Sequence, residues 1–422
     1  MTGRRPQNGL ERSPMRAPHL VLLDRALVAL LFAAGAAAAG TAGAAARPTA
    51  AQDDAAALIA RIEAPQSPNR QGLDAFTLQE VMQRFRVPGV SVAVIRDFKV
   101  HWAKAYGVAD VEAGRPVDAN TLFQAASISK PVTAMAALHL VEEGKLSLDQ
   151  DINTVLRSWR IPVSDLHRER PVTPRALFSH TSGADDGFGF PGYDPAAPRP
   201  TVVQILEGQP PSNVGPVLFA RPPYQAFKYS GGGITIMQLA LTDLTGRPFA
   251  ELMQARVLGP LGMTNSSYEQ PLPAELARRA ARAHNAQGRG MGAPWHVYPE
   301  QAAAGLWTTP TDLARFVIEV QSAVRGPAGR VLSQTTARDM VAPVGVGPFG
   351  VGLTVEKRGE GWYFSHGGSN WGFRADVLAH LRKGYGVVIM TNGDAGTAVI
   401  NEIEARVAAA YSWDSLDKLL VR

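Results

Sequence analysis

The chain has 422 residues, 45% of them hydrophobic, with 42 Lys or Arg against 37 Asp or Glu and a formal charge of +5. This length suits one catalytic unit with two lobes, and the absence of cysteine excludes disulfides, a thiol nucleophile and a lipid-modified cysteine. The basic residues are scattered and form no finger, RNA-binding or phosphate-loop motif, so we expect no nucleic-acid partner.

The first 51 residues have the pattern of an export signal and a short N-terminal segment. Arg25 precedes an apolar stretch over 26–39, and small residues continue to Ala46. A basic flank, a short apolar core and a small-residue junction are typical of a signal peptide, with cleavage after Ala46 or Ala51. The stretch is short for a membrane span. We therefore expect an exported, periplasmic or extracellular protein that meets a membrane only through this segment, if it stays uncleaved.

The elements that follow are typical of an α/β (α+β) fold. A helix is expected over Leu73–Phe85, then two paired strands, Val87–Ile95 and Val100–Gly107, whose residues alternate and are often β-branched. Helical sequence with Pro- and Gly-rich loops then continues to Val320. Four strands and a closing helix are expected near the C-terminus: Phe349–Val355, Gly361–Ser365, Gly372–Ala379, Gly386–Thr391 and Ala395–Tyr411.

Strands at both ends with helices between them predict an antiparallel sheet from N- and C-terminal segments, flanked by helices, with an inserted mostly helical lobe. We expect a linker at 52–72 and one domain at 73–415. Its sheet lobe is expected at about 73–126 and 325–415, and its helical lobe at about 127–324.

The stretch Ser127-Ile-Ser-Lys130 opens a helix rich in Ala, Leu and Met. Residues three apart lie on one helix face, so the Ser127 hydroxyl and the Lys130 amine can meet over the same turn. A neutral amine there takes the hydroxyl's proton and creates a nucleophile. Ser129 faces elsewhere. A second copy of the spacing, Ser415–Lys418, lies at the end of the chain with no long helix behind it, and we interpret it as a chance match.

Three later segments carry residue types that suit a hydrolase. Leu177–Gly183 is a small polar turn whose His180 we interpret as structural. Tyr229 stands before a glycine run, where backbone can approach a ligand closely. Phe364–Arg374 predicts a strand with His366 near its start, ahead of two glycines. Each of these residues alone is more often structural than catalytic, so their weight lies in the ordered set.

A Gly- and aromatic-rich loop over Gly183–Tyr193 is expected to wall the site, and its Asp185–Asp186 pair is interpreted as solvated. The backbone of Ala302–Thr309 is expected to border the substrate, without a chemical role. Four aromatic residues are candidates for an apolar acyl pocket: Phe188, Phe190, Tyr193 and Trp371.

In this order, the segments resemble the serine β-lactamase and penicillin-binding peptidase superfamily, and within it the class C-like esterases and D-amino-acid peptidases. The resemblance runs from about Leu73 to Trp413. It implies that Ser127 is the acylated nucleophile and Lys130 its proton acceptor. It also implies that Tyr229 is a second base or proton relay, and leaves open which of the two is the principal base. His366 would be catalytic at the first position of the family's Lys-Thr-Gly strand motif.

The resemblance further implies an oxyanion hole from the backbone N–H groups of Ser127 and Ser369. It places substrate against Gly231, Gly367, Gly368, Asn370 and Trp371.

Three departures from the family pattern bear on the substrate. Gly231 stands at the third position of the Tyr-x-Asn motif, and Gly367 replaces the threonine of the strand motif. His366 replaces a charged lysine with a group expected to titrate near neutrality. Arg374 is either a carboxylate anchor or a salt-bridged arginine. The losses favour an esterase or a D-amino-acid peptidase over a dedicated β-lactamase.

The expected function is hydrolysis of a small ester, amide or peptide through a Ser127 acyl-enzyme, without metal or cofactor. Alternatives are a D-Ala-D-Ala carboxypeptidase, a D-aminopeptidase or a class C-like β-lactamase. An alternative of another class is a catalytically inactive binding or scaffold protein on the same fold.

Overall fold

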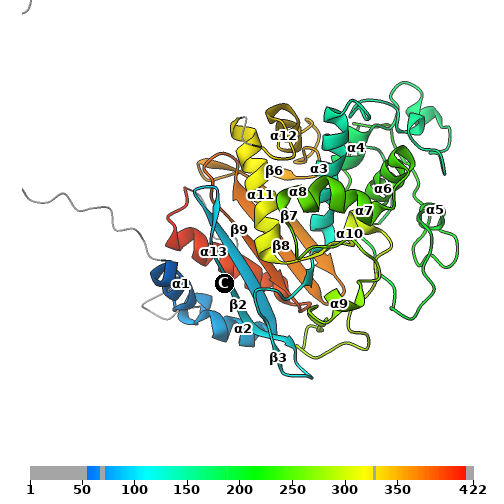
Figure 1. Ribbon diagram of the computed structural model, residues 1–422. Coiled ribbons are helices and arrows are strands. Elements are labelled where there is room, and N and C mark those ends of the chain that lie inside the picture. The colour runs from blue at the N-terminus through cyan, green and yellow to red at the C-terminus, as the bar shows by residue number, and fades with distance from the viewer. Residues whose placement is uncertain (1–54, 67–71, 188, 327–328, 415–422) are drawn as a thin grey trace, which may run out of the picture. The chain divides into compact units, whose positions relative to one another are not determined.

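The computed structural model describes residues 55–66, 72–187, 189–326 and 329–414 (Figure 1), all of which fall in one compact unit. The predicted export signal, Phe188 and the Ser415–Lys418 stretch lie outside the described residues. Within the described part of the chain, no helix combines the length and the apolar character needed to cross a bilayer.

The main sheet has seven antiparallel strands in the order β3-β2-β1-β9-β8-β7-β6. This confirms the predicted sheet from N- and C-terminal segments. Its strands are β1 (Gly89–Arg96), β2 (Lys99–Asp110), β3 (Arg115–Pro116), β6 (Thr354–Arg358), β7 (Gly361–Asn370), β8 (Phe373–His380) and β9 (Gly386–Thr391). Two short strands pair separately, β4 (Phe123–Gln124) and β5 (Trp307–Thr308).

Helices flank the sheet and fill the segment between its two halves. Before the central part of the chain they are α1 (Ala55–Glu63) and α2 (Leu78–Phe85). The central ones are α3 (Ser129–Glu142), α4 (Pro174–Phe178), α5 (Val202–Glu207), α6 (Gly231–Thr245), α7 (Phe249–Met253), α8 (Gly259–Leu261), α9 (Ala274–Ala277), α10 (Gln301–Ala304), α11 (Pro310–Arg325) and α12 (Gln334–Met340). The last is α13 (Gly396–Ala410), and a short 3-10 turn, η2 (Ala126–Ile128), precedes α3.

Strand β1 is buried on both faces because helices cover each side of the sheet. Successive strand residues point to opposite faces, so Val90, Val92 and Val94 pack in one core with α1, α2 and α13. Ala93 and Ile95 belong to the other core, with α3 and α11. Figure 1 shows α13 and α11 on opposite sides of the strands. Helix α11 lies within the range expected for the helical lobe, yet it packs on β1, β2 and β9.

The second half of β7 has one edge that β6 does not cover, which makes room for a site. The ladder between β6 and β7 ends at the pair Thr354–Ser365. The strand predicted over Phe349–Val355 is confirmed only at its last two residues, because β6 begins at Thr354 and continues to Arg358. Gly352 has φ +90 and packs so tightly on α3 that a Cβ there would lie 2.8 Å from the Ala134 Cβ. This conformation and contact are incompatible with a strand, and the open edge of β7 faces η2 instead.

Candidate active site

Ser127 and Lys130 meet at the junction of η2 and α3. Lys130 Nζ donates hydrogen bonds to Ser127 Oγ at 3.0 Å and to the Ala303 carbonyl at 2.8 Å. The lysine is 2% exposed, so these two acceptors fix its amine in a site that water hardly reaches. The carbonyl of Ala303 was not foreseen in this role, because its segment was expected only to border the substrate.

The turn that carries Ser127 is pressed against β7. Ala126 has φ +50, a left-handed conformation that is strained for a residue with a Cβ. A Cβ at Gly368 would lie 2.3 Å from the Ala125 carbonyl oxygen, so only glycine permits this approach. Ser129 lies away from the nucleophile, and its hydroxyl donates to the Ala126 carbonyl at 2.6 Å. The strain and the close contact together hold the Ser127 hydroxyl toward the open edge of the strand.

Tyr229 lies beneath the Lys130 amine, 5.1 Å from Nζ to the ring centroid. Its ring stacks on that of His180, with centroids 4.2 Å apart. Nδ1 of His180 accepts the Ser230 N–H at 3.1 Å, and its carbonyl accepts the Lys228 N–H at 2.9 Å. Burial keeps the pKa of His180 well below its ordinary value, so the ring is neutral. His180 therefore holds Lys228 and Ser230, the residues on both sides of Tyr229. Its structural role is to position the tyrosine.

The loop carboxylate Asp186 is part of the site's framework, so its interpretation as solvated is wrong. It accepts hydrogen bonds from the Ser230 hydroxyl and, at 2.6 Å, from the Gly232 N–H. Ser230 Oγ in turn accepts the Gly233 N–H at 2.8 Å, which completes the cap of α6. Burial raises the pKa of Asp186. Asp185 is more exposed and pairs with Lys228.

His366 is a buried, neutral hydrogen-bond acceptor. The expectation that it titrates near neutrality is wrong. Its Nδ1 donates to the Gly367 carbonyl at 2.7 Å, so Nε2 carries the lone pair. Burial, with a smaller effect from Lys130, lowers the pKa of His366 to about 3. The rings of Tyr229 and Phe349 lie beside it, with centroids 6.3 and 5.8 Å away.

A cavity of about 450 Å³ unites most of the predicted site residues. Among those that line it are Ser127, Lys130, Tyr229, His366, Gly367, Gly368, Ser369 and Asn370. The nucleophile candidate, both base candidates and the open edge of β7 thus share one space.

Three predicted residues lie outside this cavity: Trp371, Tyr193 and Gly231. Trp371 stacks on His296, with ring centroids 4.0 Å apart, and its backbone N–H donates to the Tyr298 hydroxyl at 3.0 Å. Tyr193 is buried and its backbone pairs with Val297. Neither residue lines the cavity, so of the expected aromatic acyl pocket only Phe190 is found there among the described residues.

Gly231 is the second residue outside the cavity that was expected to bind substrate, and Phe190 explains why. A Cβ at Gly231 would lie 2.7 Å from Cε2 of the Phe190 ring. The ring therefore fills the space that a side chain at this position would need. Asn370 does line the cavity, but its amide donates to Gln124 Oε1 at 2.8 Å and to the Ala304 carbonyl at 3.1 Å. Its role is to tie β7 to α10.

Arg374 borders the cavity as a salt-bridged residue. Its Nη2 lies 3.0 Å from Asp394 Oδ1, and its Nη1 donates to the carbonyls of Asn370 and Phe373, each at 2.7 Å. These partners occupy the guanidinium, so of the two interpretations the structure favours the ion pair.

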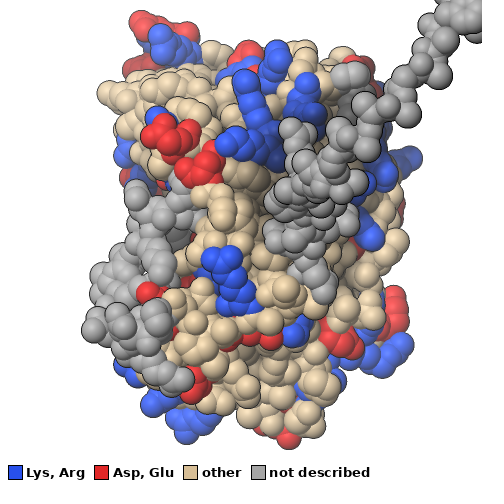
Figure 2. Space-filling view, turned by 90° about the vertical axis from the view of Figure 1, so that its left-hand side faces the viewer, with Lys and Arg blue, Asp and Glu red and all other residues tan. Residues whose placement is uncertain are grey.

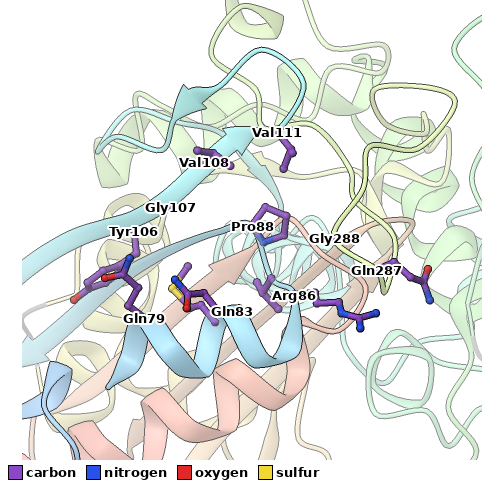
Figure 3. A pocket seen from close by; sticks show the side chains of 12 residues that line it. Gln79, Gln83, Arg86, Pro88, Tyr106, Gly107, Val108, Val111, Gln287 and Gly288 are labelled. Carbon is purple, nitrogen blue, oxygen red and sulfur yellow. The ribbon is translucent and has the colours of Figure 1, made fainter. Parts of the chain in front are cut away.

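A second cavity, of about 510 Å³, lies between α2 and β2 (Figure 3). Gln79 and Gln83 of α2 face Tyr106 and Val108 of β2 across it. It contains none of the residues predicted to act in catalysis. Across the described part of the chain, no three His, Cys, Asp or Glu side chains are grouped to hold a metal ion.

Known proteins resemble the chain over most of its length. The beta-lactamase family model matches residues 76–411. Esterase EstB of Burkholderia gladioli is 29% identical over 75% of this chain and 81% of its own. Penicillin-binding protein 4 of Amycolatopsis lactamdurans is 28% identical over 75% of this chain and 84% of its own.

Solved structures show the same fold. The D-amino acid amidase from Ochrobactrum anthropi SV3 aligns with a TM-score of 0.64 at 23% identity, over 84% of this chain and 98% of that one. At this identity the likeness concerns the fold alone. The match of the family model over residues 76–411 shows that the chain belongs to the beta-lactamase family of serine hydrolases.

Proposed function

We propose that this protein is an exported serine hydrolase that cleaves a small carboxylic ester, or an amide, through a Ser127 acyl-enzyme. The observation that carries the proposal is the 3.0 Å contact between Lys130 Nζ and Ser127 Oγ in a cavity that also holds Tyr229 and His366. A serine hydroxyl needs a neighbouring base to become a nucleophile, and this contact supplies one.

Acylation begins when Ser127 Oγ attacks the substrate carbonyl and its proton passes to the Lys130 amine. The tetrahedral intermediate then collapses, the bond to the leaving group breaks, and the leaving oxygen or nitrogen takes up that proton, directly or through Tyr229. Deacylation repeats the steps with water as the nucleophile, so the acid is released and Ser127 regains its hydrogen.

The negative charge of the tetrahedral oxygen is held by the backbone N–H groups of Ser127 and Ser369, which both border the cavity. Neutral His366 presents its Nε2 lone pair beside Lys130. It therefore acts as an acceptor that orients the ammonium or the leaving group, and adds no positive charge.

Esters are the favoured substrates. Gly367 lacks a polar side chain, the Phe190 ring fills the space in front of Gly231, and Arg374 is committed to Asp394. The cavity therefore offers a substrate carboxylate few anchors, which disfavours β-lactams and peptides ending in D-Ala. The similarity to a protein named as an esterase agrees with this preference.

We propose that this protein binds small-molecule substrates and does not bind nucleic acid. On the face seen in Figure 2, Lys and Arg side chains lie in separate groups with Asp and Glu between them. Export is proposed from the N-terminal sequence pattern. Sequencing the N-terminus of protein recovered outside the bacterial cytoplasm checks it, and a start after Ala46 or Ala51 is expected.

Replacement of the nucleophile is the decisive test. Ser127→Ala should abolish hydrolysis of p-nitrophenyl acetate and labelling by a fluorophosphonate probe, while the matched control Ser415→Ala retains both. Intact-mass analysis should locate the adduct on Ser127. Comparison with a D-Ala-D-Ala peptide and nitrocefin separates the alternatives, and we expect the ester to be the best substrate. A folded protein that neither labels nor turns over any of them would instead be a binding protein.

A further inference from the structure

Two phenylalanine rings continue from the catalytic cavity to the protein surface. Phe349 lines the cavity, and its ring centroid lies 5.8 Å from that of His366 and 6.2 Å from that of Tyr229. Its ring also stacks on that of Phe227, with centroids 5.6 Å and planes 17° apart. Phe227 is 37% exposed. The two rings, which we call the Phe349–Phe227 surface, therefore connect the reacting groups with solvent.

Phe227 is held in place although it is exposed. Among the Phe and Trp residues that the structure describes, only Phe227 and Trp362 are exposed. Gly347, at φ +77, packs so closely on Phe227 that a Cβ there would lie 2.6 Å from the ring carbon Cγ. The loop that carries Gly347 is closed by a hydrogen bond from the Val344 N–H to the Phe349 carbonyl at 3.1 Å. A ring fixed in this way loses little conformational freedom when it binds an apolar group.

The titratable neighbours of the two rings are neutral or paired. Lys228, which follows Phe227 in the chain, forms an ion pair with Asp185. The imidazoles of His180 and His366 lie beside Phe349, and burial keeps the pKa of each below its ordinary value. These neighbours leave an ionic ligand group without a partner, so the surface suits an apolar group.

The leaving group is the part of an ester that lies toward these rings. In acylation, Ser127 Oγ binds the acyl carbon, the bond from that carbon to the alcohol oxygen breaks, and the alcohol leaves with the proton that Ser127 gave to Lys130. The alcohol oxygen must therefore lie near Lys130 or Tyr229 to receive this proton. Because the ring of Phe349 lies next to that of Tyr229, a substituent of a few atoms on the oxygen reaches Phe349.

We propose that the Phe349–Phe227 surface is the leaving-group subsite, so that the preferred substrates are esters of large apolar alcohols, arylalkyl alcohols among them. This substrate class rests on the proposed hydrolase function. The ring of such an alcohol covers Phe349 and the exposed part of Phe227, which removes apolar surface of both partners from water. A short alcohol such as ethanol has too few carbon atoms to cover both rings.

Two acetate esters test the preference, 2-phenylethyl acetate and ethyl acetate. Both form the same acetyl-enzyme and release a primary alcohol, so they differ mainly in the phenyl ring. Their kcat/KM values report acylation, the step in which the alcohol is still bound, and acid release in a pH-stat measures both. We expect the wild-type kcat/KM to be at least about fivefold higher for 2-phenylethyl acetate, the effect of covering part of a phenyl ring.

Phe227→Ala and Phe349→Leu should each lower the ratio of the two kcat/KM values by about threefold or more, because each removes one ring of the subsite. The ratio cancels any loss that a variant imposes on both esters. Trp362→Ala is the matched control, because it removes an exposed aromatic side chain that does not line the cavity. It should leave the ratio unchanged.

Three outcomes overturn the proposal: a wild-type ratio below about five, a ratio that neither Phe variant lowers, or an equal fall of the ratio in Trp362→Ala. Should both Phe variants fail to fold, competitive inhibition of ethyl acetate hydrolysis decides. The inhibitor is 2-phenylethyl methyl ether, which has the ring and the oxygen of the leaving group but no acyl carbon. We expect it to inhibit the wild type, and the absence of inhibition overturns the proposal.

The two proposals fail in different ways. If neither ester is hydrolysed and Ser127 does not react with the fluorophosphonate probe, the hydrolase function itself is wrong. If Ser127 reacts, and the two esters are not hydrolysed or are hydrolysed without preference, only the leaving-group subsite is wrong.

Discussion

The imidazole of His180 stacks on the phenol ring of Tyr229, with ring centroids 4.2 Å and planes 27° apart. The same imidazole accepts the N–H of Ser230, the residue that caps α6. One buried side chain thus sets both the plane of the candidate base and the start of the helix behind it.

Replacing His180 should slow the chemical step. His180→Phe keeps a ring for stacking but leaves the Ser230 N–H without its acceptor, whereas His180→Asn keeps an acceptor and removes the ring. We expect each to lower kcat for p-nitrophenyl acetate by about 10- to 100-fold with little change in KM, because a small displacement of Tyr229 affects proton transfer more than binding. Steady-state kinetics checks this, and an unchanged kcat in both variants would exclude the positioning role.

Gly368→Ala should inactivate the enzyme by moving the nucleophile. The new Cβ would lie 2.3 Å from the Ala125 carbonyl, so the turn that carries Ser127 must shift away from β7. We expect at least about a 100-fold loss of kcat/KM, measured with p-nitrophenyl acetate. Gly215→Ala is the matched control, since a Cβ there meets no atom within 4 Å. Equal activity of the two variants would contradict the close packing described for the turn.

Buried His366 should make the fold less stable in acid. Its pKa falls from 6.5 to about 3 on folding. The folded state is therefore favoured fully above pH 6.5, and this stability is lost as pH falls toward 3, because the unfolded chain takes up the proton first. The slope is at most about 1.4 kcal/mol per pH unit for one group. Urea unfolding from pH 7 to 4 should show a smaller acid-induced loss for His366→Gln than for the wild type.

Glu300 should have the opposite effect at higher pH. It is fully buried at the start of α10, and neither carboxyl oxygen has a hydrogen-bond partner among the described residues. Burial raises the pKa of Glu300 from 4.5 to about 8, so its contribution is complete below pH 4.5 and is lost as pH rises through 8.

Glu300→Gln removes this titration. We expect the free energy of unfolding of the variant, relative to the wild type, to increase between pH 5 and 8 by up to about 1.4 kcal/mol per unit. Denaturation at the two pH values measures the difference. If the difference in unfolding free energy between variant and wild type is the same at pH 5 and pH 8, Glu300 ionises normally in the folded protein.

The features that the sequence predicted correctly are those that depend on neighbouring residues in the chain. The Ser127–Lys130 contact follows from helical spacing, and β9 has the predicted bounds because four apolar residues, Val387–Met390, follow one another in it. Tyr229 and His366 lie far along the chain, and only resemblance to a family related them to Ser127. The strand predicted at Phe349 failed because packing of Gly352 on α3 overrides its pattern.

The remaining features of the site depend on contacts between segments that are far apart in the sequence. No local sequence pattern indicates these contacts. The Ala303 carbonyl meets Lys130 because α10 packs on α3. Asp186 caps a helix that begins more than 40 residues later. The loss of titration near neutrality at His366 follows from burial, which residue type does not reveal.

The pairing of β1 with β9 joins Val90–Ile95 to Gly386–Thr391. During synthesis, the hairpin of β1 and β2 therefore keeps one edge without a partner until nearly the whole chain has left the ribosome. Such an edge readily pairs with that of another molecule. Incomplete chains should accordingly aggregate, and a C-terminal truncation before β9 should give insoluble protein, although the Ser127 turn itself would be intact in sequence.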